Sequence, residues 1–130
     1  MSGRVMIFDD DADLLELCSF VLRSKNYFVK GINKCNNIVH DVREFSPNVI
    51  LMDNWIPDSG GVKATRLLKN DLILRYIPVV LFSANEKVRD LAAEAGAEFY
   101  LPKPFNIDDL EAVITKAIAR HRSAGISKVL

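Results

Sequence analysis

The sequence predicts an α/β fold with a parallel sheet, because short apolar runs alternate with longer segments of helical period. The 130-residue chain falls within the size of one domain and is long enough to bury a substantial core. The apolar runs at residues 49–52 and 79–82 lack polar alternation, as expected of central parallel strands covered on both faces. We therefore expect one domain over residues 1–122 and a short C-terminal tail over residues 123–130.

Five segments have the length and composition of strands. Residues 27–32 mix polar and apolar side chains, which predicts an edge strand. Pro47 and Pro78 each precede a strand, where they mark the end of a loop. The predicted strands cover residues 4–8, 27–32, 48–52, 77–82 and 98–101.

The segments between the strands repeat apolar side chains at helical spacing, so each can cover a sheet face. The last helix is predicted to start at Asn106, with Asp108 and Asp109 in its first turn to suit the helix dipole, and to stop near Arg122. Gly96 is expected to end the preceding helix. The predicted apolar helix faces consist of Leu14, Cys18, Val21 and Leu22, then Ile38, Val42 and Phe45, and finally Leu110, Val113, Ile114, Ala117 and Ile118.

Composition argues against several classes of protein. The 17 basic and 17 acidic residues balance without a basic block, so we expect no nucleic-acid binding by this chain alone. Cys18 and Cys35 lack metal-ligand spacing and are predicted to be buried thiols without a disulfide. The first residues form neither a signal peptide nor a spanning segment, which predicts a cytoplasmic protein without a membrane partner.

Polar side chains follow four of the predicted strands. Asp9 and Asp10 follow the first strand, and Asp53 follows the third. Ser83 follows the fourth strand, and Lys103 comes after the fifth. The carboxyl ends of parallel strands share one edge, where open α/β sheets bind their ligands. Three carboxylates, a hydroxyl and an ammonium gathered there suit magnesium and a phosphoryl group.

Each of these residue types also has an ordinary structural explanation. A single aspartate, serine or lysine after a strand is usually a solvated loop residue or a helix cap, and their joint placement is what favours a site. Asp11 is expected to cap the helix that starts at Ala12 rather than bind a cation. Pro102 and Pro104 restrict the backbone on both sides of Lys103 and so limit where its side chain can point. The Lys103–Pro104 bond is a candidate for the cis form.

Four stretches closely resemble the signature sequences of response-regulator receiver domains, in order and at the usual separations. They are residues 5–11 (VMIFDDD), 49–57 (VILMDNWIP), 78–84 (PVVLFSA) and 100–105 (YLPKPF). The resemblance covers residues 4–121. It implies a flavodoxin-like (βα)5 fold, a doubly wound parallel five-stranded sheet with strand order 2-1-3-4-5.

The resemblance also implies a two-component signalling function. Asp53 would accept a phosphoryl group from a phosphohistidine on a sensor histidine kinase or histidine phosphotransfer protein, and the output partner stays unknown. Magnesium (Mg2+) would be bound by Asp10, Asp53 and the backbone carbonyl of Trp55, with Asp9 acting through water. Such a chain is a phosphoacceptor that promotes its own phosphotransfer and autodephosphorylation rather than an enzyme.

The same resemblance assigns the switch residues. Lys103 would pair with a phosphoryl oxygen, while the Ser83 hydroxyl and the Ala84 backbone amide would close on the others. Tyr100 would be the switch aromatic, turning inward as Ser83 moves. Without the resemblance, Tyr100 would be interpreted as an ordinary core aromatic.

Three positions depart from the family pattern. Ser83 stands where threonine is commoner but keeps the hydroxyl. Gly60 replaces a frequent aspartate, which leaves Ser59 as the expected cap of the next helix. Trp55 is bulky at a variable position beside Asp53. Trp55 and Asn85 occupy the positions that tune dephosphorylation in this family, so the lifetime of the phosphorylated form is left open.

Two other functions compete with this interpretation. A haloacid-dehalogenase-type phosphohydrolase would use the Asp-x-Asp of residues 9–11 with Asp9 as nucleophile, but Asp53 and its loop would then be superfluous and the chain is short for that fold. A non-phosphorylated interaction module is disfavoured because all the acids, Ser83 and Lys103 are present. Whether the chain is a single-domain regulator or the receiver of a longer protein is left open.

Overall fold

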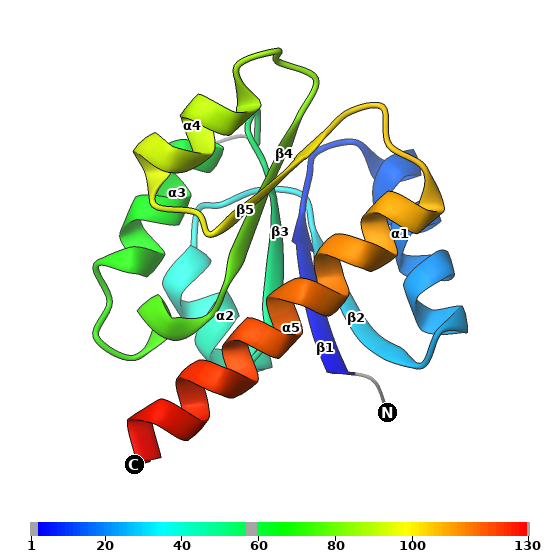
Figure 1. The fold of residues 1–130 in the computed structure, drawn as a ribbon. Helices are drawn as coiled ribbons and strands as arrows, with labels where there is room; N and C mark the ends of the chain where they lie inside the picture. The colour runs from blue at the N-terminus through cyan, green and yellow to red at the C-terminus, as the bar shows by residue number, and fades with distance from the viewer. Residues whose placement is uncertain (1–2, 57–59, 130) are drawn as a thin grey trace.

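The structure, a computed structural model, describes residues 3–56 and 60–129, with side chains up to residue 122 (Figure 1). Strands and helices alternate along the chain, which confirms the predicted fold class. No helix in this described part is long and apolar enough to cross a membrane. The elements are β1 (Gly3–Phe8), α1 (Ala12–Ser24), β2 (Tyr27–Ile32), α2 (Ile38–Phe45), β3 (Val49–Asp53), α3 (Gly61–Lys69), the 3-10 helix η1 (Leu74–Tyr76), β4 (Val79–Ser83), α4 (Val88–Ala95), β5 (Phe99–Pro102) and α5 (Ile107–Val129).

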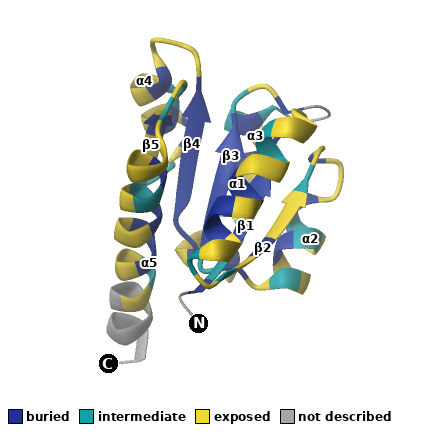
Figure 2. Cartoon of the chain, turned by 90° about the vertical axis from the view of Figure 1, so that its right-hand side faces the viewer, coloured by how far each residue is buried: buried dark blue, intermediate teal, exposed yellow. Residues whose placement is uncertain are grey.

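The five strands form one parallel sheet in the order β2-β1-β3-β4-β5, as the resemblance implied. Every residue of β3 and β4 is buried. β2 is the predicted edge strand and is largely exposed, as Figure 2 shows by its contrast with the buried central strands. The carboxyl ends of β1, β3, β4 and β5 therefore lie side by side at one edge of the sheet, at the top of Figure 1.

The core has two apolar layers, one on each face of the sheet. Because successive side chains of a strand point to opposite faces, each central strand contributes to both layers. Helices α2, α3 and α4 cover one layer, and α1 and α5 cover the other (Figure 1). Every apolar helix position that the periodicity predicted is buried or half-buried, so those amphipathic faces are confirmed.

Cys18 and Cys35 are buried and form no disulfide in the described part of the chain, as predicted. Burial raises the pKa of the Cys18 thiol to about 11, and the negative charge of Asp9 adds to the shift. The thiolate is the reactive form of cysteine. Cys18 is therefore expected to be unreactive at neutral pH.

Three local features predicted from the sequence are confirmed: a helix cap, a helix end and a cis peptide bond. The Asp11 carboxylate accepts hydrogen bonds from the N–H groups of Asp13 (3.1 Å) and Leu14 (3.2 Å), so Asp11 caps α1 as expected. Gly96 ends α4 in the left-handed conformation with φ 83°, which glycine adopts without a Cβ clash. The Lys103–Pro104 bond is cis, as the sequence suggested.

Several predicted boundaries were wrong by one residue: β1 begins at Gly3, β3 is Val49–Asp53, β5 is Phe99–Pro102, and β4 ends at Ser83. Two others differ by more than one residue. Helix α5 continues to Val129 instead of stopping near Arg122, so it includes most of the segment predicted as a tail. No proline follows Arg122, and the single glycine beyond it costs a helix only about 1 kcal/mol. β4 begins at Val79 rather than Ile77, because the Ile77 N–H bonds to the Leu74 carbonyl at 3.0 Å and closes η1. The predicted capping residue Ser59 lies outside the described residues.

Asp71 orders the turn between α3 and β4. Its Oδ1 atom accepts the N–H groups of Ile73 and Leu74, both at 2.9 Å, and its Oδ2 atom lies 2.9 Å from an Arg43 guanidinium nitrogen. The two backbone hydrogen bonds, with Arg43 as a further contribution, lower the pKa of Asp71 below its ordinary value of 3.8. A lowered carboxyl pKa means that the ionised form stabilises the fold.

We predict that Asp71→Asn is less stable than the wild type at neutral pH, because the variant keeps an acceptor but loses the charge. The carboxylate's contribution is present above the unfolded pKa and is lost as pH falls through the lower folded pKa. The stability gap should therefore shrink below about pH 3.8. Urea unfolding across the acid range measures it, with Glu86→Gln as the exposed charge control. A gap that is constant with pH would contradict this role.

Candidate functional site

The structure brings the predicted site residues together at the carboxyl edge of the sheet. Asp9 and Asp10 follow β1 directly, and Asp53 is the last residue of β3. Ser83 is the last residue of β4, and Lys103 follows β5. Parallel strands that end in register deliver these side chains to one crevice, as the sequence predicted.

Three carboxylates meet in this crevice. Asp9, Asp10 and Asp53 each place one oxygen within 4.8 Å of the others. Asp9 and Asp53 are buried, whereas Asp10 is exposed. The Lys103 Nζ atom lies 3.0 Å from Asp9 Oδ2 and 2.9 Å from Asp53 Oδ1, so one ammonium bridges the two buried carboxylates. This bridge offsets the repulsion between the carboxylates.

The pKa values of Asp9 and Lys103 are both raised, but for different reasons. Burial raises the pKa of Asp9, and the hydrogen bonds from the Asp11 N–H and from Lys103 oppose that effect. Burial would lower the pKa of Lys103, but its hydrogen bonds to Asp53 and Asp9 and their charges outweigh burial, and the pKa is raised. Lys103 is therefore a firmly protonated donor at neutral pH.

Strand β4 holds Lys103 at both ends of the residue. The Lys103 N–H donates to the Ser83 carbonyl at 2.9 Å. The Nζ atom lies 4.5 Å from the centroid of the Phe82 ring, within the range of a cation–π contact. Nothing in the sequence motifs singled out Phe82. The sequence did contain one signal. Phe82 directly precedes Ser83, and the predicted strand that carries it was expected to lie beside the strand that leads to Lys103.

The loop after β3 packs against the Asp53 backbone. The Gly61 N–H donates to the Asn54 carbonyl at 3.0 Å. A Cβ atom on Gly61 would clash with the Asp53 carbonyl oxygen and lie 2.8 Å from Asn54 Cα. The Trp55 N–H lies 3.3 Å from Asp53 Oδ2, and the Trp55 side chain is 74% exposed. The loop therefore needs glycine at position 61, and its indole is largely exposed to solvent.

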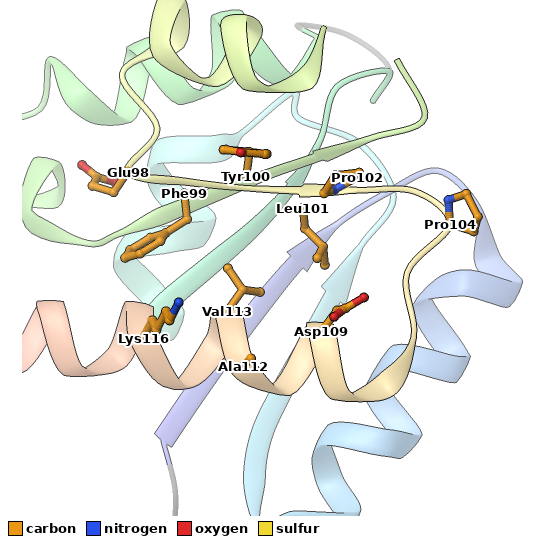
Figure 3. A pocket seen from close by; sticks show the side chains of 10 residues that line it. All are labelled: Glu98, Phe99, Tyr100, Leu101, Pro102, Pro104, Asp109, Ala112, Val113 and Lys116. Atoms are coloured by element: carbon orange, nitrogen blue, oxygen red, sulfur yellow. The ribbon is translucent and has the colours of Figure 1, made fainter. Parts of the chain in front are cut away.

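The predicted switch residues lie in different surroundings. Ser83 is buried, and its hydroxyl oxygen accepts the Asn85 N–H at 3.0 Å. Ala84 and Asn85 are exposed in the loop that follows. Tyr100 is 42% exposed, so its interpretation as a core aromatic is wrong. Figure 3 shows Tyr100 on the side of β5 away from α5, opposite the Leu101 side chain.

Comparisons with known proteins agree with the fold and the crevice. The chain matches the model of the response regulator receiver domain over residues 5–115. The phosphate regulon transcriptional regulatory protein PhoB of Klebsiella pneumoniae is 30% identical, with 100% of this chain and 58% of the relative covered. The DNA-binding response regulator MtrA of Mycobacterium tuberculosis (strain ATCC 25618 / H37Rv) is 31% identical, with 93% and 53% covered. The chain spans little more than half the length of these curated relatives.

Solved structures extend the likeness. A putative response regulator from Chloroflexus aurantiacus J-10-fl has a TM-score of 0.85 at 22% identity, covering 90% of this chain and 98% of that one. The receiver domain of sensor histidine kinase PA1611 from Pseudomonas aeruginosa PAO1 has a TM-score of 0.82 at 25% identity, with the same coverage, and its structure holds a magnesium ion in the active site cleft.

The chain therefore belongs to the response regulator receiver domains, the phosphoacceptor domains of two-component signal transduction. The family resemblance inferred from the four motifs is confirmed. Nothing in the comparisons favours the haloacid-dehalogenase alternative.

We predict that Gly61→Ala lowers the free energy of unfolding by about 1–3 kcal/mol, because the new Cβ overlaps backbone atoms that cannot move independently. Urea unfolding measures the loss, and the Asp53 amide resonance reports displacement of the site. Gly31→Ala is the matched control, since its Cβ would meet the flexible end of Leu15 at 3.2 Å. If Gly61→Ala and Gly31→Ala lower the free energy of unfolding equally, the close backbone contact at Gly61 is not the cause of the loss.

Proposed function

We propose that Asp53 is the phosphoacceptor and takes the phosphoryl group from a phosphohistidine on a sensor histidine kinase or histidine phosphotransfer protein. The observation that supports this choice is the hydrogen bonding of the two buried acids, Asp9 and Asp53. Both Asp9 oxygens are held, Oδ1 by the Asp11 N–H at 2.9 Å and Oδ2 by Lys103. Asp53 Oδ2 receives one long hydrogen bond from Trp55 among the described residues, which leaves it the most available buried nucleophile.

The same acids suit magnesium. Magnesium takes oxygen ligands at about 2.0–2.1 Å in octahedral geometry, so ligand oxygens lie within roughly 4.2 Å of one another. The clustered carboxylate oxygens come close to this spacing. We assign Asp10, Asp53 and the backbone carbonyl of Trp55 as direct ligands, and Asp9, whose oxygens are already bonded, as a ligand through water. The magnesium in the PA1611 receiver supports this assignment. When bound, magnesium neutralises charge on the phosphoryl oxygens.

The remaining residues stabilise the transfer. An Asp53 oxygen attacks phosphorus in line, an O–P bond forms, the N–P bond of the phosphohistidine breaks, and the nitrogen keeps the electron pair. Lys103 pairs with a phosphoryl oxygen, and the Ser83 hydroxyl and Ala84 amide bind the others. The Ser83 oxygen already accepts an N–H from Asn85, so its proton is available to donate.

Phosphorylation then changes the output surface. A dianionic phosphate on Asp53 offers new contacts to Ser83 and Ala84, which is the differential interaction that a shift between two states requires. Tyr100 is the aromatic that turns inward as Ser83 moves, from the exposed position it has here. The output partner is not identified by these residues.

The setting of this function is also a proposal. We place the receiver domain at residues 1–122 in the cytoplasm, where a histidine kinase presents its phosphohistidine. The balanced charge of the chain supports the expectation that this segment alone binds no nucleic acid, although PhoB and MtrA are named as regulators that act on transcription or bind DNA.

We predict that Asp53→Asn abolishes labelling by acetyl phosphate with magnesium, because the amide lacks the nucleophilic oxygen but keeps the shape. Intact mass with mapping of the modified residue measures labelling, and circular dichroism checks the fold. Asp41→Asn, in α2 and outside the carboxylate cluster, should label normally. Labelling of Asp53→Asn at the wild-type rate would refute the assignment, and turnover of free phosphate esters would instead favour a phosphohydrolase.

We predict that Trp55 slows hydrolysis of the aspartyl phosphate, because it lies two residues after Asp53, with its backbone N–H 3.3 Å from Asp53 Oδ2, and its indole offers no acceptor to orient a water. Trp55→Ala should shorten the phosphorylated lifetime several-fold, and Asn85→Ala should change it less. Decay after donor removal, with magnesium saturating in each variant, gives the lifetimes. An unchanged or longer lifetime in Trp55→Ala would contradict shielding, and the exposed indole would then be assigned to a partner-docking surface.

A further inference from the structure

The Phe82 ring lies against the lysine that bridges the two buried carboxylates. Phe82 is 1% exposed, and its ring centroid lies 4.5 Å from Lys103 Nζ. The negative face of an aromatic ring attracts an ammonium within about 6 Å, most strongly where water is excluded. The ammonium has three N–H donors, and Asp9 and Asp53 accept two of them. The ring occupies a further side of the ammonium.

The ring itself is held in a fixed orientation. Phe105 meets it edge to face, with ring centroids 6.3 Å apart and the ring planes at 61°. Both rings lie in the apolar layer that α1 and α5 cover. The Phe82 carbonyl accepts the Asn54 N–H at 3.2 Å, which ties this residue to the Asp53 loop. Phe82 is therefore buried and in contact with both Lys103 and the loop of the proposed phosphoacceptor.

Phosphoryl transfer changes the charged partners of Lys103, whereas the Phe82 ring takes no part in the bond changes. When an Asp53 oxygen bonds to phosphorus, that carboxylate becomes an acyl phosphate and its own negative charge is consumed. Lys103 then loses one of its two anionic partners in the crevice and gains phosphoryl oxygens. The Phe82 ring is neutral and buried, so its attraction for the ammonium is the same before and after transfer.

We propose that Phe82 is a positioning residue for phosphoryl transfer, holding the Lys103 ammonium between Asp9 and Asp53 by a cation–π contact. The proposal rests on the proposed function of Asp53. Phe82 acts through Lys103 and does not touch the phosphoryl group. Its electrostatic role is separate from its packing, because an aliphatic side chain would fill the layer but offer no negative face.

Stepwise fluorination of the ring tests this role without changing its shape. Phenylalanine carrying one, two or three fluorines, incorporated at position 82, weakens the negative face in steps. The rate of labelling by acetyl phosphate at saturating magnesium should fall with each fluorine and reach roughly threefold to tenfold below wild type. Rates that stay flat across the series at Phe82 would overturn the proposal.

Two controls separate electrostatics from structure. The same series at Phe99, which packs against the same apolar layer on β5, should leave the rate unchanged, and a parallel loss there would show a general effect on the core. In a Lys103→Ala background the Phe82 series should also be flat, because no ammonium remains. A continued fall in that background would show that the ring acts independently of Lys103 and would overturn the proposal.

A readout without phosphorylation keeps this proposal distinct from the function of Asp53. In the metal-free protein, the ring current of Phe82 should shift the Lys103 ε-CH2 protons upfield, and Phe82→Leu should return them to ordinary values. Ordinary values in the wild type would overturn the stacked geometry. An upfield shift in a protein that acetyl phosphate labels elsewhere than Asp53 would instead contradict the proposed function and leave the ring contact intact.

Discussion

The rest of the site depends on the ion bridge between the Lys103 ammonium and the buried carboxylates of Asp9 and Asp53. Parallel strands that end at one edge bring like charges together, and such charges repel strongly when they are taken out of water. One ammonium between them makes the arrangement tolerable and connects the strand at one edge of the sheet to two central strands. The crevice can therefore hold a concentrated negative charge while the free protein stays folded.

The four acids at this edge of the sheet differ in what else they bond. Asp11 caps a helix through its side chain, and its own N–H fixes one oxygen of Asp9. Asp10 is exposed, and Asp53 keeps one weakly held oxygen in a buried position. Four carboxylates of identical chemistry thus differ in hydrogen bonding and burial, which supports the separate roles proposed for them. The separation comes from hydrogen bonds and burial, and not from residue type.

The sequence predicted the fold and the crevice because both follow from local rules. Apolar runs mark buried parallel strands, and such strands gather the residues at their ends, so Asp53 and Lys103 could be placed without coordinates. The Phe82 contact could not be placed in this way, since it depends on which face each side chain takes and on the register of neighbouring strands. The end of α5 was missed because neither a proline nor a strong cap marks a stop. The exposure of Tyr100 fits its place on β5, which has a neighbouring strand on one side alone.

The two ion contacts of Lys103 join residues 94 and 50 positions apart in the chain. No fragment of the fold can reproduce them, because β1, β3 and β5 must all be in place before the ammonium reaches both carboxylates. A molecule in which one of these strands is not in place therefore lacks the crevice altogether. A ligand specific to the crevice therefore binds only molecules in which these strands are assembled, and its binding stabilises the folded domain.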